Sequence, residues 1–161
     1  MKIMLEEILR ESMRARGLTL ATAESCTGGL VSDRITNVSG SSEYFPGGVV
    51  AYSYEAKASL LGVSWDTLNA HGAVSEETVL EMARGARKLF NADIGISVSG
   101  IAGPTGGLPE KPVGTTWFGL SANSGEWARH FIWDGDRKQN KHHSSEAALQ
   151  FVLDYLEGKL S

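Results

Sequence analysis

The sequence predicts a three-layer α/β/α sandwich around a mixed, mostly parallel sheet with a late β-hairpin. Helical and strand-like segments alternate through residues 3–99, which is the pattern of parallel strands covered by helices on both faces. Two alternating segments then flank a turn at residues 123–125, as in an antiparallel hairpin. With 161 residues, the chain is expected to form a single domain over residues 1–161.

The N-terminal segment is expected to contain a helix, a strand and a turn into a second helix. Apolar residues recur at helical spacing before Gly17, which suits the left-handed conformation at a helix end. Residues 18–23 read as a short buried strand, and the turn at 27–29 opens a helix that runs to about Ile35. Ser25 therefore falls at a strand-to-helix junction.

The middle of the chain is expected to place a lysine on a short helix after a strand. Residues 47–53 form a β-rich run, and residues 55–61 look helical and end at Gly62. Lys57 falls in the first turns of that helix. The elements expected after it are a helix capped by Ser75 that runs to about Phe90, a strand at 93–99, strands at 115–122 and 126–133, and a final helix at about 137–156.

Composition excludes several classes of function. The net charge of −4 gives no broad positive field, so tight binding to nucleic acid is not expected. Cys26 is the only cysteine, which excludes an intrachain disulfide and a multi-cysteine zinc site and fits a reducing compartment. No long apolar run or signal peptide is recognisable, so no membrane span is expected and the cytoplasm is the expected location.

The turn after the first strand is a candidate nucleophile turn. A serine at the mouth of a helix has backbone N–H groups beside it that can bind an oxyanion, although Ser25 or Thr27 as a simple helix cap is the plainer interpretation. The four histidines show no pattern that would supply a base or a metal site. Lys57 is the alternative base if burial lowers its pKa, and Tyr52 is placed to orient its amine.

A glycine-rich loop is the second candidate region. Residues 99–107 carry glycines where a backbone can approach a phosphate, but they match neither a Walker loop nor a dinucleotide fingerprint. Lys111 just beyond the loop and Arg137 at the start of the last helix are cations suited to a phosphate. An exposed cation is more often simply solvated.

Taken together, these segments resemble the CinA C-terminal domain family, whose characterised enzymes are nicotinamide mononucleotide amidohydrolases. The resemblance covers nearly the whole chain. The matching motifs, in order, are residues 23–29, Tyr52 with 55–57, 61–63, 71–75, 100–104, 110–115 and 135–137.

The resemblance implies an enzyme that converts nicotinamide mononucleotide to nicotinate mononucleotide and ammonia without a metal or a cofactor. It implies Ser25 as nucleophile, Lys57 as general base and Tyr52 as a helper in the proton network. The expected substrate-binding residues are Thr27, Gly28, Ser99, Gly100, Gly103, Gly106, Lys111 and Arg137. The expected partner is a small pyridine nucleotide, and a homo-oligomer is compatible with the sequence.

Two departures from the family pattern leave alternatives open. Tyr54 stands where the family commonly has asparagine, and an aromatic ring there is expected to crowd the pocket. Lys141 stands where the family tends to have a second arginine, and lysine does not reproduce a bidentate grip on phosphate. The alternatives are a catalytically weak or inactive nucleotide-binding paralogue, and a hydrolase for another amide or ester.

Overall fold

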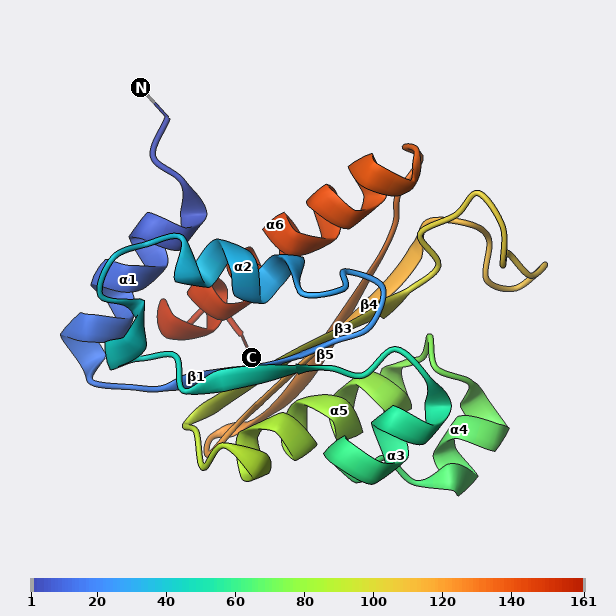
Figure 1. Cartoon of the computed structure of the whole chain (residues 1–161), viewed down its shortest axis with the longest axis horizontal. Coiled ribbons are helices and arrows are strands. Elements are labelled where there is room, and N and C mark those ends of the chain that lie inside the picture. Colours follow the sequence, from blue (N-terminus) through green and yellow to red (C-terminus); the bar gives the residue numbers. More distant parts are fainter. Residues whose placement is uncertain (1, 161) are drawn as a thin grey trace.

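The computed structural model describes residues 2–160 and confirms the predicted sandwich (Figure 1). A five-stranded sheet with the strand order β2-β1-β3-β4-β5 lies between two layers of helices. The strands are β1 (Leu20–Glu24), β2 (Gly47–Val50), β3 (Ile94–Gly100), β4 (Thr115–Ala122) and β5 (Gly125–Ile132). The mixed sheet and the late hairpin are confirmed. Parallel pairs do not outnumber antiparallel ones, because β1 pairs in parallel with β2 and β3 while the hairpin adds β4 and β5 antiparallel.

Three helices cover each face of the sheet in the described part of the chain. One layer holds α1 (Leu5–Arg16), α2 (Leu30–Thr36) and α6 (Arg137–Leu156); the other holds α3 (Tyr54–Leu61), α4 (Trp65–His71) and α5 (Glu76–Leu89). A single 3-10 turn, Ser41–Glu43, precedes β2. The sequence did not predict α4, since Leu68 is its one buried side chain and it therefore lacks an apolar face.

Local signals fix several of the observed helix ends. Gly17 and Gly62 both adopt the left-handed conformation as predicted, with φ of 64° and 69°. Ser75 caps α5 by accepting a hydrogen bond from the Thr78 amide. The strand predicted at 47–53 is shorter than expected, because β2 ends at Val50 and the next two residues turn towards α3.

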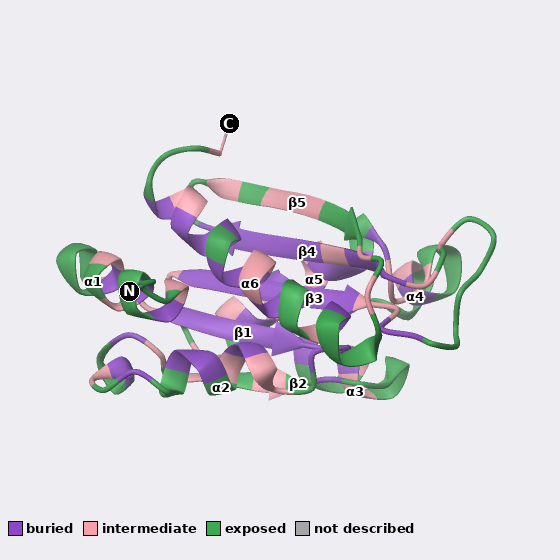
Figure 2. Ribbon diagram, turned by 90° about the horizontal axis from the view of Figure 1, so that it is seen from above, coloured by how far each residue is buried: buried purple, intermediate pink, exposed green. Residues whose placement is uncertain are grey.

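The two faces of the sheet are packed differently. The face under α1, α2 and α6 carries large buried side chains such as Ile96 and Phe118, and the central strands are buried along most of their length (Figure 2). The opposite face presents small residues to α5. A Cβ on Gly95 or Gly119 would lie far inside van der Waals contact with backbone carbonyls of α5. The Ser97 hydroxyl donates to the Val79 carbonyl at 2.5 Å, so α5 packs almost backbone to backbone against β3 and β4.

This close approach predicts that Gly119→Ala destabilises the protein. The added methyl group collides with the Val79 carbonyl rather than with a movable side chain, and overpacking of this kind costs about 1–3 kcal/mol. Urea denaturation measures the loss in the free energy of unfolding. The control is Ala128→Ser on β5, which adds one atom to the half-buried residue paired with Gly119. Equal effects of the two substitutions would contradict the close packing.

Candidate active site

Ser25 and Lys57 meet although they come from different elements. Ser25 directly follows β1, and its backbone N–H donates to the Val98 carbonyl of β3 at 2.9 Å. Lys57 lies on α3, and its Nζ is 2.9 Å from the Ser25 Oγ. Both residues are buried, with exposed fractions of 7% and 1%. The predicted proximity is confirmed, while the catalytic roles of the two residues stay predictions.

The Lys57 amine has neutral neighbours. It donates to the Ala51 carbonyl at 2.9 Å and to the Tyr52 carbonyl at 3.4 Å, and none of the ion pairs within residues 2–160 involves it. Burial lowers its pKa to about 8, because desolvation disfavours the charged form. A neutral amine can give its two N–H groups to the two carbonyls and leave its lone pair for the Ser25 hydroxyl. The arrangement suits a base that takes the serine proton.

The neighbouring thiol is a poor competitor for the nucleophile's role. Cys26 is buried, and desolvation raises its pKa to about 12. A thiol in that state carries almost no thiolate at neutral pH, and the thiolate is the reactive form. Ser25 is therefore the better candidate nucleophile in the turn.

The turn after Ser25 leaves two backbone amides without an acceptor in another residue. Between residues 25 and 32, every other amide of the described structure donates to a backbone carbonyl or to the Glu24 carboxylate. The exceptions are the N–H groups of Cys26 and Thr27, the two residues that follow the nucleophile. Buried amides are almost always paired, so this pair is a candidate oxyanion hole. Glu24 was not among the residues predicted from the sequence to act in the site, although it directly precedes Ser25.

Arg137 connects the predicted catalytic and substrate-binding regions. Its guanidinium donates to the Gly103 carbonyl at 2.8 Å and to the Tyr52 hydroxyl at 3.1 Å. Tyr52 is 62% exposed, and it contacts Lys57 through its backbone carbonyl rather than through its phenol. The phenol is therefore placed to hold Arg137, whereas the sequence suggested that it would orient the lysine amine.

Lys141, a departure from the family pattern, and Lys111, a predicted binding residue, lie in two different places. Lys141 lies over the nucleophile turn, since its Nζ is 3.7 Å from where a Cβ on Gly28 would sit. Lys111 lies elsewhere, because its ammonium donates to the His71 carbonyl at the end of α4 at 2.7 Å. Arg137 instead donates to the Gly103 carbonyl, so the two cations are held by carbonyls of different segments, and their joint phosphate site stays a prediction.

The glycine-rich loop lines one side of a cavity next to Arg137. Ser99 and Gly100 end β3 at the same sheet edge as Ser25, while Gly103 and Gly106 have positive φ values of 86° and 94° in the loop. The cavity has a volume of about 550 Å³. It is lined by Ala102, Gly103, Pro104, Val113, Gly135, Asp136, Arg137 and Lys138.

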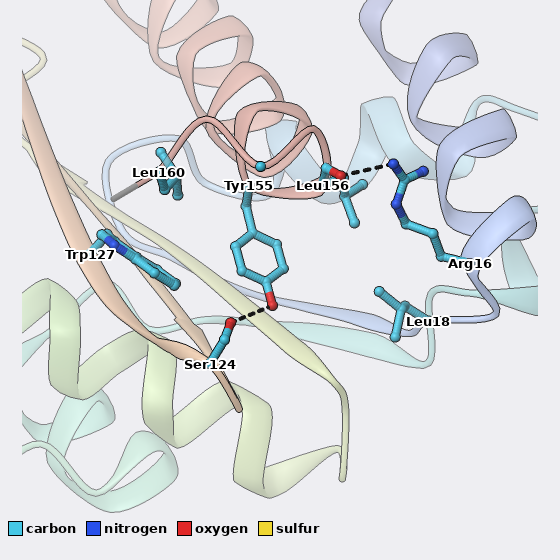
Figure 3. Close-up of a pocket in the computed structure, with 8 residues that line it drawn as sticks. Arg16, Leu18, Ser124, Trp127, Tyr155, Leu156 and Leu160 are labelled. Carbon is cyan, nitrogen blue, oxygen red and sulfur yellow. Dashed lines mark hydrogen bonds between the residues drawn. The ribbon is translucent and has the colours of Figure 1, made fainter.

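A further cavity, of about 470 Å³, lies beyond the opposite end of β1 (Figure 3). Leu18 and Leu156 contribute apolar walls, and Tyr155 shares a hydrogen bond of 2.9 Å with Ser124. None of the residues that line it was predicted to act in catalysis or binding. The cavity contains no arrangement of nucleophile and base, so it is not the candidate active site.

No group of three or more histidine, cysteine, aspartate or glutamate side chains between residues 2 and 160 is arranged to hold a metal ion. No helix in the same range is long and apolar enough to cross a membrane.

Comparisons with known proteins agree on one family. The CinA C-terminal domain family matches residues 2–156. A CinA-like protein of Kosmotoga olearia is 51% identical over 148 residues, which is 92% of this chain and 36% of the relative. A putative competence-damage inducible protein of Thermoanaerobacter pseudethanolicus is 49% identical over 96% of this chain and 37% of its own length. The chain thus spans little more than a third of these relatives.

Solved structures show the same fold. The competence damage-inducible protein A of Klebsiella pneumoniae superposes with a TM-score of 0.92 at 37% identity, covering 95% of both chains. The competence/damage inducible protein of Agrobacterium tumefaciens superposes with a TM-score of 0.87, also at 37% identity, over 98% of this chain and 99% of that one.

The lowered pKa of Lys57 predicts that the reactivity of Ser25 depends on pH. If the neutral amine is the base, labelling of Ser25 by a fluorophosphonate should rise about tenfold per pH unit up to about pH 8 and then level off. Mass spectrometry of the labelled protein measures the rate between pH 5.5 and 9.5. In Lys57→Met, labelling should be slow and lose this dependence. A flat profile for the unaltered protein would rule out Lys57 as the base.

Proposed function

Since this chain belongs to the CinA C-terminal domain family, we propose that it is an amidohydrolase that converts nicotinamide mononucleotide to nicotinate mononucleotide and ammonia. The observation that carries the proposal is the buried pair in which the Lys57 amine lies 2.9 Å from the Ser25 hydroxyl. A buried lysine beside a serine carries a desolvation cost that a hydrophobic residue filling the same space would avoid, and its pKa of about 8 makes the free amine accessible near neutral pH.

The proposed reaction proceeds through an acyl-enzyme. Lys57 takes the proton of Ser25 while the Oγ attacks the carboxamide carbon, and the resulting oxyanion accepts hydrogen bonds from the amides of Cys26 and Thr27. Collapse of the tetrahedral intermediate breaks the C–N bond as the protonated Lys57 gives its proton to the amide nitrogen, which leaves as ammonia. Water then attacks the ester with Lys57 again as base, which releases the carboxylate and restores the serine hydroxyl.

The phosphate end of the substrate is assigned to α6. Arg137 and Lys141 are four residues apart, so their side chains leave the same face of the helix, and Gly103 and Gly28 mark where the two cations lie. Arg137 offers a planar fork for two phosphate oxygens, whereas Lys141 offers a point charge. The cavity of about 550 Å³ beside Arg137 gives room for part of a nucleotide.

The alternative of an inactive paralogue is based on Tyr54 and Lys141, and the contacts of Tyr54 do not support it. Tyr54 packs against Trp65 of α4 with ring centroids 6.4 Å apart, and its hydroxyl lies near Gly72. No hydrogen bond or ring contact within residues 2–160 joins Tyr54 to Ser25 or Lys57. Its contacts therefore give no support to the expected crowding of the pocket.

The direct test is ammonia release from nicotinamide mononucleotide by the purified protein. Ser25→Ala should lower kcat by at least about 1000-fold, because it removes the nucleophile and the acyl route with it. The variant should still bind the nucleotide in titration calorimetry, which serves as the control for folding. If the unaltered protein is labelled at Ser25 by a fluorophosphonate but releases no ammonia from this substrate, the substrate assignment is wrong.

The phosphate assignment predicts different effects for two cations of the candidate set. Arg137→Ala should weaken nucleotide binding by about 1.5–3 kcal/mol, the scale of a hydrogen bond to a charged group. Lys111→Ala should change affinity less than about twofold, because its ammonium is held by the His71 carbonyl. Titration calorimetry with nicotinamide mononucleotide measures both. Equal losses would mean that Lys111 moves to the phosphate and that our assignment is incomplete.

A further inference from the structure

We infer that Glu24 is a positioning residue for the proposed reaction: its carboxylate holds the turn after Ser25 in the shape that leaves the Cys26 and Thr27 amides available to the oxyanion. The inference rests on the proposed acyl-enzyme chemistry, but it does not depend on which amide or ester is the substrate. It adds a residue that contacts neither the nucleophile's hydroxyl nor the base.

The Glu24 carboxylate is buried and bound by the turn itself. Only 1% of the residue is exposed. One oxygen accepts from the Thr27 hydroxyl at 2.6 Å and from the amides of Gly29 and Val31 at 3.2 and 2.9 Å. The other accepts from the amide and the hydroxyl of Ser32 at 3.0 and 2.7 Å.

No cation balances this buried charge. Within residues 2–160, no lysine, arginine or histidine forms an ion pair with Glu24. A buried carboxylate without a counterion is costly, so its charge must be stabilised by the five donors that converge on it. All five lie within eight residues of Glu24 along the chain, which makes the carboxylate the centre of a closed local structure.

This local structure determines which amides stay free. Glu24 takes the amides of Gly29, Val31 and Ser32, and carbonyls of the chain take those of Ser25, Gly28 and Leu30. The amides of Cys26 and Thr27 are left over. Thr27 is held twice, because its hydroxyl binds Glu24 and its carbonyl accepts from Leu30 at 3.1 Å. Thr27, which supplies one of the two proposed oxyanion donors, therefore also makes the shortest of the five hydrogen bonds to Glu24.

Glutamine is not an adequate replacement at this position. Both carboxylate oxygens accept hydrogen bonds from at least one amide and one hydroxyl. A side-chain amide would therefore turn its NH₂ group towards donors in either orientation. We expect the turn in Glu24→Gln to rearrange and the oxyanion donors to lose their alignment.

The experiment compares Glu24→Gln with Glu6→Gln, which makes the same change at another buried carboxylate. Glu6 lies on α1 and binds Arg34 at 2.6 Å, away from the nucleophile turn. In each variant, a fluorophosphonate titration counts the reactive serines, so that kcat for nicotinamide mononucleotide is expressed per reactive site. Thermal denaturation records the structural cost separately.

For Glu24→Gln we expect kcat per site and the rate of fluorophosphonate labelling each to fall about 10- to 100-fold, part of the loss seen when an oxyanion donor is removed. KM should change less than about twofold, and the midpoint of the pH profile should stay near 8, because no contact joins Glu24 to Lys57. Glu6→Gln should lower the melting temperature but keep kcat per site within about twofold.

Unchanged kcat per site in Glu24→Gln would overturn the inference, as would an equal loss in Glu6→Gln. If Glu24→Gln does not fold, Thr27→Val decides, because it removes a single donor to the carboxylate and keeps the shape of the side chain. It should then lower kcat per site about 3- to 10-fold, and no loss would also overturn the inference. If nicotinamide mononucleotide proves not to be the substrate, the labelling rates still test Glu24 while the proposed function fails.

Discussion

The burial of one lysine amine against one serine hydroxyl is the interaction on which the rest of the site depends. Taking an ammonium group out of water costs free energy, and no carboxylate within residues 2–160 forms an ion pair with Lys57 to offset that cost. Two carbonyls and the Ser25 hydroxyl are the groups that meet it. The ends of β1 and β2 must therefore lie where these groups converge. β2 ends at Val50, and the carbonyls of the next two residues, Ala51 and Tyr52, accept hydrogen bonds from the amine.

The sheet provides the rigidity that such a pair needs. Helix α5 packs on small residues of β3 and β4 so closely that a single methyl group at Gly95 or Gly119 has no room. Helix α3, which carries Lys57, packs in turn on α5, where Gly85 allows equally close contact with the end of α3 at Leu61. Lys57 is thus carried by α3, which is itself tightly packed on α5. A displacement of about 1 Å between reacting groups can cost about 100-fold in rate, so this packing contributes to function as well as to stability.

The sequence predicted the features that depend on local chemistry and missed those that depend on where elements meet. Gly17 and Gly62 marked helix ends because a left-handed residue is a local requirement. The short α4 gave no periodic signal, since it buries only Leu68. The contact of Lys111 with α4 was beyond prediction for the same reason, because the helix that receives it was not foreseen. The closeness of Ser25 and Lys57 was suggested by family resemblance, whereas spacing along the chain left it undetermined.

In the proposed site the cations of α6 lie at the phosphate end, and this placement has a chemical reason. A substrate phosphate brings negative charge near a buried amine, and negative charge raises the pKa of an amine by favouring its protonated form. That change would remove the free base at the moment when the substrate binds. Cations that neutralise the phosphate at its own end of the site oppose this shift. Arg137, held by Gly103 and Tyr52, and Lys141, over Gly28, lie on one helix face where they can do so. In the proposed mechanism the cations of α6 would anchor the nucleotide and also limit the rise in the pKa of Lys57 while the carboxamide reacts.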